Sequence, residues 1–382
     1  MKAALVIGRY DGGGGGAERW TDRHARFLLA QGVEVHLIAS RFVDPPSHAI
    51  CHHVAKGWGA GRRLRFAERV EQICRREGFD VVHDMGDGWH CDFFMPHHGT
   101  RASTLERNLD VLSPAARRLQ DWAYRWAPRY LEFAELERRQ YAAESNATYI
   151  AVSQMVKRDM QRRYGVPAER IRLVYNGVDA RRFQPRRGEA RPAAWPWSDR
   201  VVHLLAAHNF ELKGLASLVR AAARLRAEGA PVGLAVLGSG RPGPYRRLAR
   251  RLGCEDSIVF LGNQPDPLPF YQSADVYVQP TYYDPCSLVV LEALACGLPV
   301  VTTRQNGASE LLTDGLEGAV LDDPRDVQAL ADAMRRYLDG EERKKAGQAA
   351  RRLAERCTLA RNSSAILNLY RERLGLPVRR VG

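Results

Sequence analysis

The chain has 382 residues and a formal net charge of +13, with 45% hydrophobic and 26% charged residues. This composition is that of a soluble globular protein, and it excludes collagen-like, coiled-coil and disordered chains. No run of about 18 apolar residues occurs, so the sequence predicts no transmembrane helix, and its glycine-rich start predicts no secretory signal. The length exceeds what one hydrophobic core usually serves, so we expect two domains.

The first half of the chain alternates predicted strands and helices. In order, these are strand 3–7, helix 17–31, strand 33–39, helix 62–77, strand 80–83, a long polar helical segment at 104–144 and strand 149–152. Alternation of this kind indicates a parallel sheet covered by helices on both faces.

After a segment rich in proline and arginine the alternation starts again. The predicted elements are strand 201–206, helix 214–228, strand 232–237, helix 245–252, strand 258–261, strand 276–279, helix 287–295, strand 299–302, helix 326–338 and a final helix at 359–374. We therefore predict an α/β fold of two doubly wound, Rossmann-like domains facing a central cleft, because ligands of such sheets bind beyond the carboxyl ends of the strands. We place the N-terminal domain at 1–183, the linker at 184–200 and the second domain at 201–358.

The cysteine content indicates the cellular compartment of the protein, and the net charge indicates the class of molecule that it binds. The seven cysteines form no CxxC pair, which predicts neither a disulfide framework nor a cysteine zinc site and is typical of a reducing, cytoplasmic protein. The positive charge indicates an anionic partner, and nucleic acid, acidic lipid and a phosphorylated substrate all fit it.

Five consecutive glycines, Gly12 to Gly16, lie between the first strand and the first helix. They loosely match a dinucleotide-binding pattern, but the second strand ends in Ser40-Arg41 without the acidic residue that an NAD site needs. We favour a backbone that approaches a ligand closely at a helix start. A flexible surface loop is the alternative.

The segment 275–310 concentrates polar groups around a predicted helix start. Asp284 and Glu292 are separated by seven residues, and Ser287 is suited to cap the helix between them. Free N–H groups there favour an anion, and two carboxylates favour hydroxyl groups, which together suggest a ligand with phosphate and vicinal hydroxyls. The alternative is an ordinary cap and a solvated glutamate, although Glu292 lies within an apolar stripe.

This segment resembles the E-x7-E region of family 4 retaining glycosyltransferases of the GT-B fold, which include lipopolysaccharide core glucosyltransferases and phosphatidylinositol mannosyltransferases. Further matches occur in the family's order, at Gly15–Glu18, Tyr175–Asp179, Lys213-Gly214, Leu237–Gly240, Phe260–Gly262 and Ala274-Asp275. The resemblance covers about residues 1–375, and it implies that the final helix, 359–376, crosses back onto the first domain.

The resemblance implies roles in binding the donor. Glu292 would hold the ribose hydroxyls of a nucleotide, and Asp284, one methylene shorter than the family's glutamate, would contact the donor sugar. Lys213 would neutralise the diphosphate, although a surface lysine is the alternative, and His208 stands where a basic residue is usual. The further donor-binding positions are Gly15, Gly16, Gly262, Asn263, Cys286, Ser287 and Leu288.

The histidines of the first domain offer a second part of the site. His98 best matches the family's active-site histidine, so we count it with Lys213 and Asp284 as catalytic, while a loop histidine without a role is the alternative. His97 and Thr100 are predicted to contact the acceptor. A zinc site from His83, His90, Cys91 and His97 matches no known metal spacing, so we expect no metal and no cofactor.

The stretch 101–144 interleaves aromatic residues with arginines. Such a pattern suits an anionic membrane surface, and the alternative is a helical hairpin packed on its own domain. No fold signature for nucleic-acid binding accompanies it.

Taken together, the resemblance implies a metal-independent, retaining glycosyltransferase. It would move a hexose from a nucleotide diphosphate sugar, UDP-sugar before GDP-sugar, to a cell-envelope glycan or lipid-linked acceptor such as lipopolysaccharide core. We expect a cytoplasmic monomer or weak dimer, peripheral on the inner face of the cell membrane. A UDP-sugar epimerase of the same fold and a non-enzymatic basic protein that binds anions or RNA remain alternatives.

Overall fold

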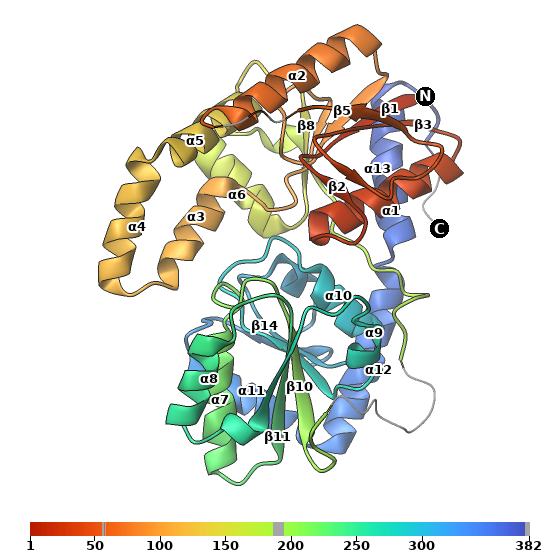
Figure 1. The fold of residues 1–382 in the computed structure, drawn as a ribbon. Helices are drawn as coiled ribbons and strands as arrows, with labels where there is room; N and C mark the ends of the chain where they lie inside the picture. Colours follow the sequence, from red (N-terminus) through yellow and green to blue (C-terminus); the bar gives the residue numbers. More distant parts are fainter. Residues whose placement is uncertain (56, 58, 186–194, 379–382) are drawn as a thin grey trace. The chain divides into compact units, whose positions relative to one another are not determined.

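The computed structural model describes residues 1–55, 57, 59–185 and 195–378. The chain forms two compact units, one of Met1–Tyr175 with Ala360–Gly382 and the other of Asn176–Leu359 (Figure 1). Each unit contains one parallel β-sheet with helices interleaved between its strands, so the prediction of two Rossmann-like α/β domains is confirmed.

The sheet of unit 1 has the strand order β5-β3-β1-β6-β7-β8-β9, with every neighbouring pair parallel. The interior strands β1 and β3 are mostly apolar and almost wholly buried, as expected of strands covered on both faces. A separate short pair, β2 (Tyr10–Asp11) and β4 (Phe42–Val43), flanks the start of the first helix. The strand bounds are β1 Lys2–Val6, β3 Glu34–Ala39, β5 Ile50–His53, β6 Val81–Asp84, β7 Phe93–Phe94, β8 Thr148–Ala151 and β9 Ile171–Leu173.

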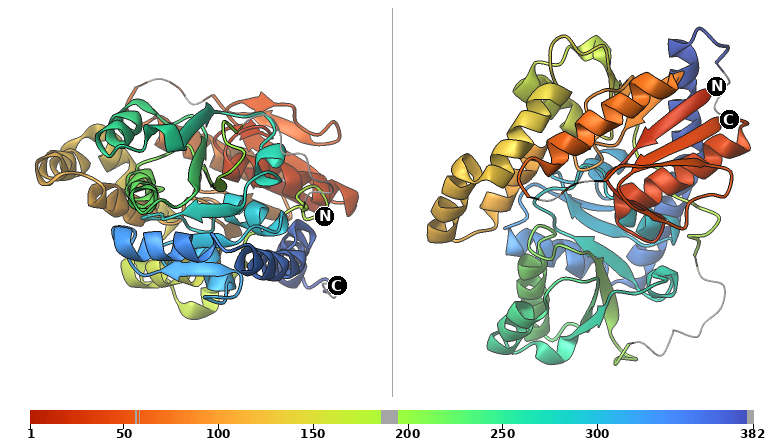
Figure 2. Two further views of the ribbon diagram at one scale, coloured as in Figure 1. Left: turned by 90° about the horizontal axis from the view of Figure 1, so that it is seen from below. Right: turned by 45° about the horizontal axis from the view of Figure 1, so that its top comes forward.

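The helices of unit 1 include the last helix of the chain. Their bounds are α1 Gly16–Ala30, α2 Arg62–Glu77, α3 Arg101–Asp110, α4 Pro114–Trp126, α5 Pro128–Gln140, α6 Gln154–Tyr164 and α13 Leu359–Arg373, with a 3-10 turn at Ala168–Arg170. Figures 1 and 2 show α13, in dark blue, beside α1, in red. Two contacts fix it there: Trp20 Nε1 donates to Asn362 Oδ1 (2.9 Å), and His83 Nδ1 lies 2.5 Å from the Tyr370 hydroxyl.

Unit 2 has the strand order β12-β11-β10-β13-β14-β15, also parallel throughout. Its strands are β10 Val201–Ala206, β11 Val232–Leu237, β12 Ile258–Gly262, β13 Val276–Gln279, β14 Val300–Thr303 and β15 Gly318–Leu321. Its helices are α7 Leu215–Ala227, α8 Gly243–Arg251, α9 Leu268–Tyr271, α10 Leu288–Ala295, α11 Val327–Arg336 and α12 Gly340–Arg356, with 3-10 turns at Glu255–Ser257 and Gly307–Leu311.

The last residue of the predicted N-terminal domain and the second part of the predicted linker both pack within unit 2. Phe183 is fully buried and meets the Tyr271 ring edge-on at 5.9 Å between centroids. Trp195 and Trp197 are also buried, and Trp197 Nε1 donates to the Asp256 carbonyl (2.9 Å). Unit 2 therefore begins at Asn176 rather than at 201, while positions 186–194 of the predicted linker lie outside the described residues.

Candidate functional site

In unit 2, the ammonium group of Lys213 and the carboxylate of Asp284 form a half-buried ion pair. Lys213 Nζ donates to Asp284 Oδ2 (2.7 Å) and to the Tyr283 carbonyl (3.0 Å), and Gln279 Nε2 donates to the same carboxylate oxygen (3.1 Å). The two side chains are only 18% and 14% exposed. Lys213 therefore presents its charge from a fixed position, which is what a group that stabilises a developing anion requires.

A glycine makes this pairing possible. Gly214, the N-cap of α7, has a φ of +75°, and a Cβ there would lie 2.0 Å from the Pro280 carbonyl oxygen. The backbone after Lys213 thus lies directly against the loop that carries Asp284. Only glycine allows both the left-handed conformation and this close approach.

The start of α10 is organised by side chains from neighbouring loops. Ser287 is the N-cap, as predicted, but its side chain makes no cap hydrogen bond and instead donates to Gln279 Oε1 (3.3 Å). The Ser287 N–H donates to Asn306 Oδ1 (3.3 Å), and the Cys286 carbonyl accepts from Asn176 Nδ2 (2.8 Å). Cys286 and Ser287 are buried, and Leu288 is half-buried.

Glu292 lies on the buried side of α10 and is only 1% exposed. The Tyr271 hydroxyl donates to its Oε2 (3.2 Å), and Leu291 and Ala293 beside it are fully buried. The alternative of a solvated glutamate is therefore wrong. A carboxylate inside an apolar helix is expensive unless it has hydrogen-bond partners, and the Tyr271 hydroxyl is one such partner.

The other predicted donor positions of unit 2 lie after β10 and at the end of β12, beside the loop that follows β11. His208 is exposed, with Nδ1 2.9 Å from Ser239 Oγ, and Gly262 and Asn263 are exposed at the end of β12. Gly238 donates its N–H to the Gly262 carbonyl (2.8 Å), which ties these loops together. All of these groups lie at the carboxyl edge of the unit 2 sheet, where parallel sheets bind ligands.

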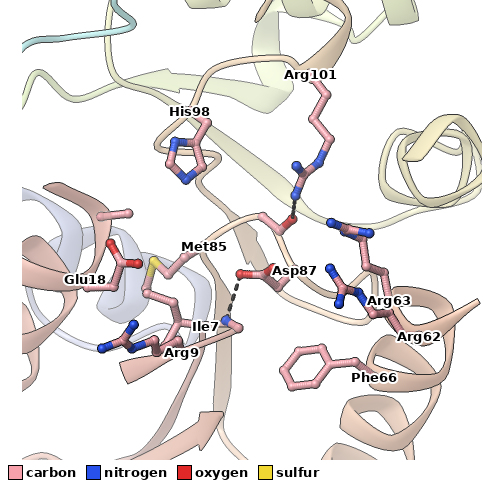
Figure 3. Close-up of a pocket in the computed structure, with 13 residues that line it drawn as sticks. Ile7, Arg9, Glu18, Arg62, Arg63, Phe66, Met85, Asp87, His98 and Arg101 are labelled. Carbon is pink, nitrogen blue, oxygen red and sulfur yellow. Dashed lines mark hydrogen bonds between the residues drawn. The ribbon is translucent and has the colours of Figure 1, made fainter. Parts of the chain in front are cut away.

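Unit 1 contains a cavity of about 250 Å³ at the corresponding edge of its own sheet (Figure 3). The loops after β1 and β6 and the first turns of α1, α2 and α3 form its walls. The charged and polar side chains that line it are Arg9, Glu18, Arg62, Arg63, Asp87, His98 and Arg101.

The loop after β6 is built on the buried side chain of Asp84. Its carboxylate accepts the backbone N–H groups of Gly86, Asp87 and Gly88 at 2.7–2.8 Å, and burial raises its pKa to about 7. Asp87 in turn accepts the N–H of Gly8 through Oδ2 (2.7 Å), as Figure 3 shows. These bonds fix the floor of the cavity.

The glycine loop before α1 is also hydrogen-bonded. Gly13 donates to Asp11 Oδ1 (3.0 Å), and Gly14 donates to the Asp11 carbonyl (2.9 Å). A Cβ on Gly15 would lie 2.8 Å from Glu18 Oε2, so the glutamate folds back over the helix start. Gly15 and Gly16 are therefore next to the cavity through Ala17 and Glu18, which line it.

Comparison with known proteins now identifies the family. The model for "Glycosyltransferase Family 4" matches residues 14–182, and the model for "Glycosyl transferases group 1" matches residues 199–340. An MMP alpha-(1->4)-mannosyltransferase of Mycolicibacterium hassiacum is 31% identical over 310 residues, which is 78% of this chain and 72% of that protein. The chain belongs to glycosyltransferase family 4.

Other family 4 relatives match over shorter stretches. A D-inositol 3-phosphate glycosyltransferase of Saccharomonospora viridis is 35% identical over 243 residues, and the match spans 60% of this chain and about half (56%) of that protein. The crystal structure of WaaG, a glycosyltransferase involved in lipopolysaccharide biosynthesis, has a TM-score of 0.79 at 21% identity, covering 96% of this chain and 99% of WaaG. This likeness places the chain in the GT-B fold.

Not every position inferred from family 4 lies at the cavity. His98 lines it, but His97 packs against Trp20 with 4.5 Å between ring centroids, and burial lowers its pKa to about 3. Thr100 is fully buried and caps α3 by accepting the Ser103 N–H (3.2 Å). The acceptor-binding role of His97 and Thr100 stays a prediction.

Most of the charged groups that line the cavity carry no motif that identifies them in the sequence. Arg9 and Asp87 lie three residues after the ends of β1 and β6, and the other arginines and Glu18 lie in the first turn of a helix. Such positions at the carboxyl ends of strands were the available signal. The cavity brings together residues that are far apart in the sequence, such as Arg9, Arg62 and Arg101. Within the described ranges, no three His, Cys, Asp or Glu side chains come together as a metal-binding group.

Proposed function

We propose that this family 4 glycosyltransferase moves a hexose, with retention of anomeric configuration, from a nucleotide diphosphate sugar to a cell-envelope glycan or lipid-linked acceptor. UDP-sugar is our first choice of donor and GDP-sugar our second, and lipopolysaccharide core is an example of the acceptor. The relatives named above are a mannosyltransferase and an inositol phosphate glycosyltransferase, which supports a hexosyl donor and a hydroxyl acceptor.

The observation that carries the proposal is the Lys213–Asp284 pair beside the start of α10. As the bond from the anomeric carbon to the diphosphate oxygen breaks, negative charge grows on the diphosphate. Lys213 would stabilise that charge without a metal ion, together with N–H groups at the helix start and the His208 side chain. Asp284 would accept a hydrogen bond from the donor sugar, and Glu292 would hold the ribose hydroxyls.

The acceptor would bind in the cavity of unit 1, beside His98. Its hydroxyl oxygen forms the new bond to the anomeric carbon on the face that the diphosphate leaves, and its proton passes to the departing phosphate oxygen. This route needs no side chain as general base, in keeping with what the family resemblance implies. His98 is then left to contact the donor sugar near the reacting carbon.

Calorimetric titration with UDP, GDP and ADP in the presence of EDTA tests the donor site. We expect selective binding of one nucleotide, and Glu292→Gln should weaken it by about 10- to 100-fold because a charged hydrogen-bond acceptor is lost. Glu255→Gln, a surface carboxylate paired with Arg250, is the matched control and should change nothing.

Binding of no nucleotide, alongside tight association with RNA or anionic vesicles, would contradict the transferase and favour a non-enzymatic anion-binding protein. Release of a new sugar isomer from the donor in the absence of any acceptor would favour an epimerase. EDTA-sensitive binding of the nucleotide would contradict metal independence.

We also propose that α4 contacts an anionic membrane surface. Leu119, Trp122 and Trp126 are 62–70% exposed and recur at helical spacing, so they share one face of α4 with the exposed Arg118. Tyr124 instead packs against Tyr130 at 4.5 Å between ring centroids, so the tyrosines serve the helical hairpin. Among the described residues, no helix is long and apolar enough to cross a bilayer.

Sedimentation with anionic vesicles tests this surface. We expect the double substitution Trp122→Ser and Trp126→Ser to weaken partitioning by about tenfold or more, because two indole rings lose their burial in the interface. Leu316→Ser removes a comparably exposed apolar side chain from unit 2 and is the control. Equal partitioning of the two variants would contradict the proposal.

A further inference from the structure

Three arginines gather on one wall of the unit 1 cavity. Figure 3 shows the guanidinium groups of Arg62, Arg63 and Arg101 together on one side, while Arg9 and Glu18 lie on the other. They come from the first turns of α2 and α3, where the helix dipoles add positive potential. Like charges repel one another, so such a cluster is stable only where something compensates it.

A single aromatic ring holds two of these guanidinium groups in place. The Arg63 guanidinium carbon lies 3.9 Å from the centre of the Phe133 ring, and that of Arg101 lies 4.4 Å from it. Phe133 itself is buried, on α5. Stacking of this kind fixes the plane of a guanidinium group while leaving its N–H edge open to a ligand.

The carboxylates of Glu132 and Glu137, behind the arginines, accept hydrogen bonds mainly from backbone N–H groups rather than from the guanidinium groups. Glu132 accepts the N–H of Arg63, and its other oxygen is 3.5 Å from the Arg63 guanidinium, which is a long ion pair. Glu137 accepts the N–H of Arg101 (2.7 Å), and Arg101 Nη2 donates to the Gly86 carbonyl (3.3 Å). Both glutamates therefore fix the helix starts, and their negative charges offset only part of the positive charge of the three arginines.

Arg62 extends the cluster toward solvent. It is exposed and forms no ion pair with another residue of the described ranges. The pKa of Arg63 is lowered by burial, an effect that Glu132 opposes and that the positive charges of Arg62, Arg101 and Arg129 reinforce. A bound anion would relieve this repulsion, because it adds the opposite charge at the point where three positive groups meet.

The opposite wall of the cavity suits hydroxyl groups. Glu18 lines this wall, and Asp87 lies on the floor between Glu18 and the arginines, so both present carboxylate oxygens to the cavity, which His98 also lines (Figure 3). A volume of about 250 Å³ is below the 300–1,000 Å³ usual for drug-sized ligands, so it accommodates about one sugar ring with a small substituent.

We infer that the arginine cluster of Arg62, Arg63 and Arg101 binds a phosphate group carried by the acceptor, next to the hydroxyl that is glycosylated. The inference rests on the proposed function and narrows its acceptor to a phosphorylated polyol or sugar. Planar guanidinium groups bind phosphate oxygens in pairs, which fixes the orientation of the acceptor as well as its affinity.

Calorimetric titration of the full chain with glucose 1-phosphate and with glucose tests the inference, with UDP titrated separately. We expect glucose 1-phosphate to bind and glucose to bind far more weakly. Arg62→Gln combined with Arg101→Gln should weaken glucose 1-phosphate binding by about tenfold or more, and added salt should weaken it in the unaltered protein.

Arg75→Gln removes one positive charge, as Arg62→Gln alone does, from the last turn of α2, where Arg75 is exposed and paired with Glu71, and it is the control for that single variant. It should change Kd by less than about twofold. Arg62→Gln alone repeats the test at an exposed position, in case the double variant unfolds.

A second titration distinguishes a soluble phosphate from a lipid headgroup. Vesicles containing phosphatidic acid are compared with vesicles of phosphatidylcholine alone, using the same variants. The inference is also supported if the unaltered protein binds the phosphatidic acid vesicles but not glucose 1-phosphate, and the double variant loses vesicle binding. That result assigns the phosphate to a lipid-linked acceptor.

Three results would overturn it. The first is equal binding of glucose and glucose 1-phosphate, with vesicle binding unaffected by the double substitution. The second is an equal loss of UDP binding in the double variant, which would assign the cluster to the donor. The third is no UDP binding in the unaltered protein, which contradicts the proposed function itself and is visible in its own titration.

Discussion

At the scale of single residues, substitutions in the Lys213–Asp284 pair separate two proposed roles, which are binding of the diphosphate by Lys213 and binding of the donor sugar by Asp284. Asp284→Asn removes the charge that holds Lys213 Nζ at 2.7 Å, so the ammonium group is free to meet a diphosphate. We expect UDP binding to be unchanged or tighter, while sugar transfer falls by about 100-fold because the donor sugar loses a negatively charged hydrogen-bond acceptor. Lys213→Met should weaken UDP binding and transfer together.

Calorimetry with UDP and the rate of UDP release from the donor measure the two effects. Asp322→Asn, at a carboxylate that is 83% exposed and paired with Arg304, is the control and should leave both values unchanged. If Asp284→Asn weakened UDP binding as much as Lys213→Met, the ion pair would serve the diphosphate as a unit and the separation of roles would be wrong.

At the scale of elements, long periodic segments were predictable from sequence and tertiary contacts were not. Helices such as α2 and α7 and strands such as β10 and β11 lie within one or two residues of their predicted bounds, because their apolar periodicity is strong. The two-residue strand β7 is too short to carry a period. Ser287 shows a different limit of prediction from sequence. Its position as N-cap follows from the neighbouring residues, but its hydroxyl donates to Gln279, a tertiary contact that the local sequence does not indicate.

Helix α12 was not predicted because its buried side consists mostly of small residues. Ala346, Ala349 and Ala350 are buried, and a Cβ on Gly347 would lie 2.3 Å from the Gly297 carbonyl oxygen. Glycine inside a helix is normally unfavourable, and here it permits a backbone contact that no local pattern encodes. The arginine cluster is a similar case, since Arg62 and Arg101 meet only through the fold.

At the scale of the whole molecule, buried histidines should make the protein sensitive to mild acid. Burial lowers the pKa of His24 and His97 to about 3 and that of His203 to about 4, and it lowers the pKa of His83 as well. Above pH 6.5 these groups are neutral in both states and do not affect stability. As pH falls below 6.5, the unfolded chain binds protons that the folded chain does not, so stability is lost at about 1.4 kcal/mol per pH unit for each histidine.

The carboxyl group of Asp84 has the opposite effect on folding stability over the same pH range. Because burial raises its pKa to about 7, the folded chain binds a proton that the unfolded chain binds only near pH 4, so acidification favours folding through this one group. The four histidines outnumber it, and the net effect between pH 6.5 and 4.5 is a loss of stability.

Urea unfolding of the full chain at several pH values between 6.5 and 4.5 measures this slope. His97→Phe keeps an aromatic ring against Trp20 and removes one titrating group, so it should reduce the slope by about 1.4 kcal/mol per pH unit. A stability that is flat over this range would mean that the buried imidazoles take up protons in the folded state, and the packing of α13 against His24 and His83 would then tolerate charge.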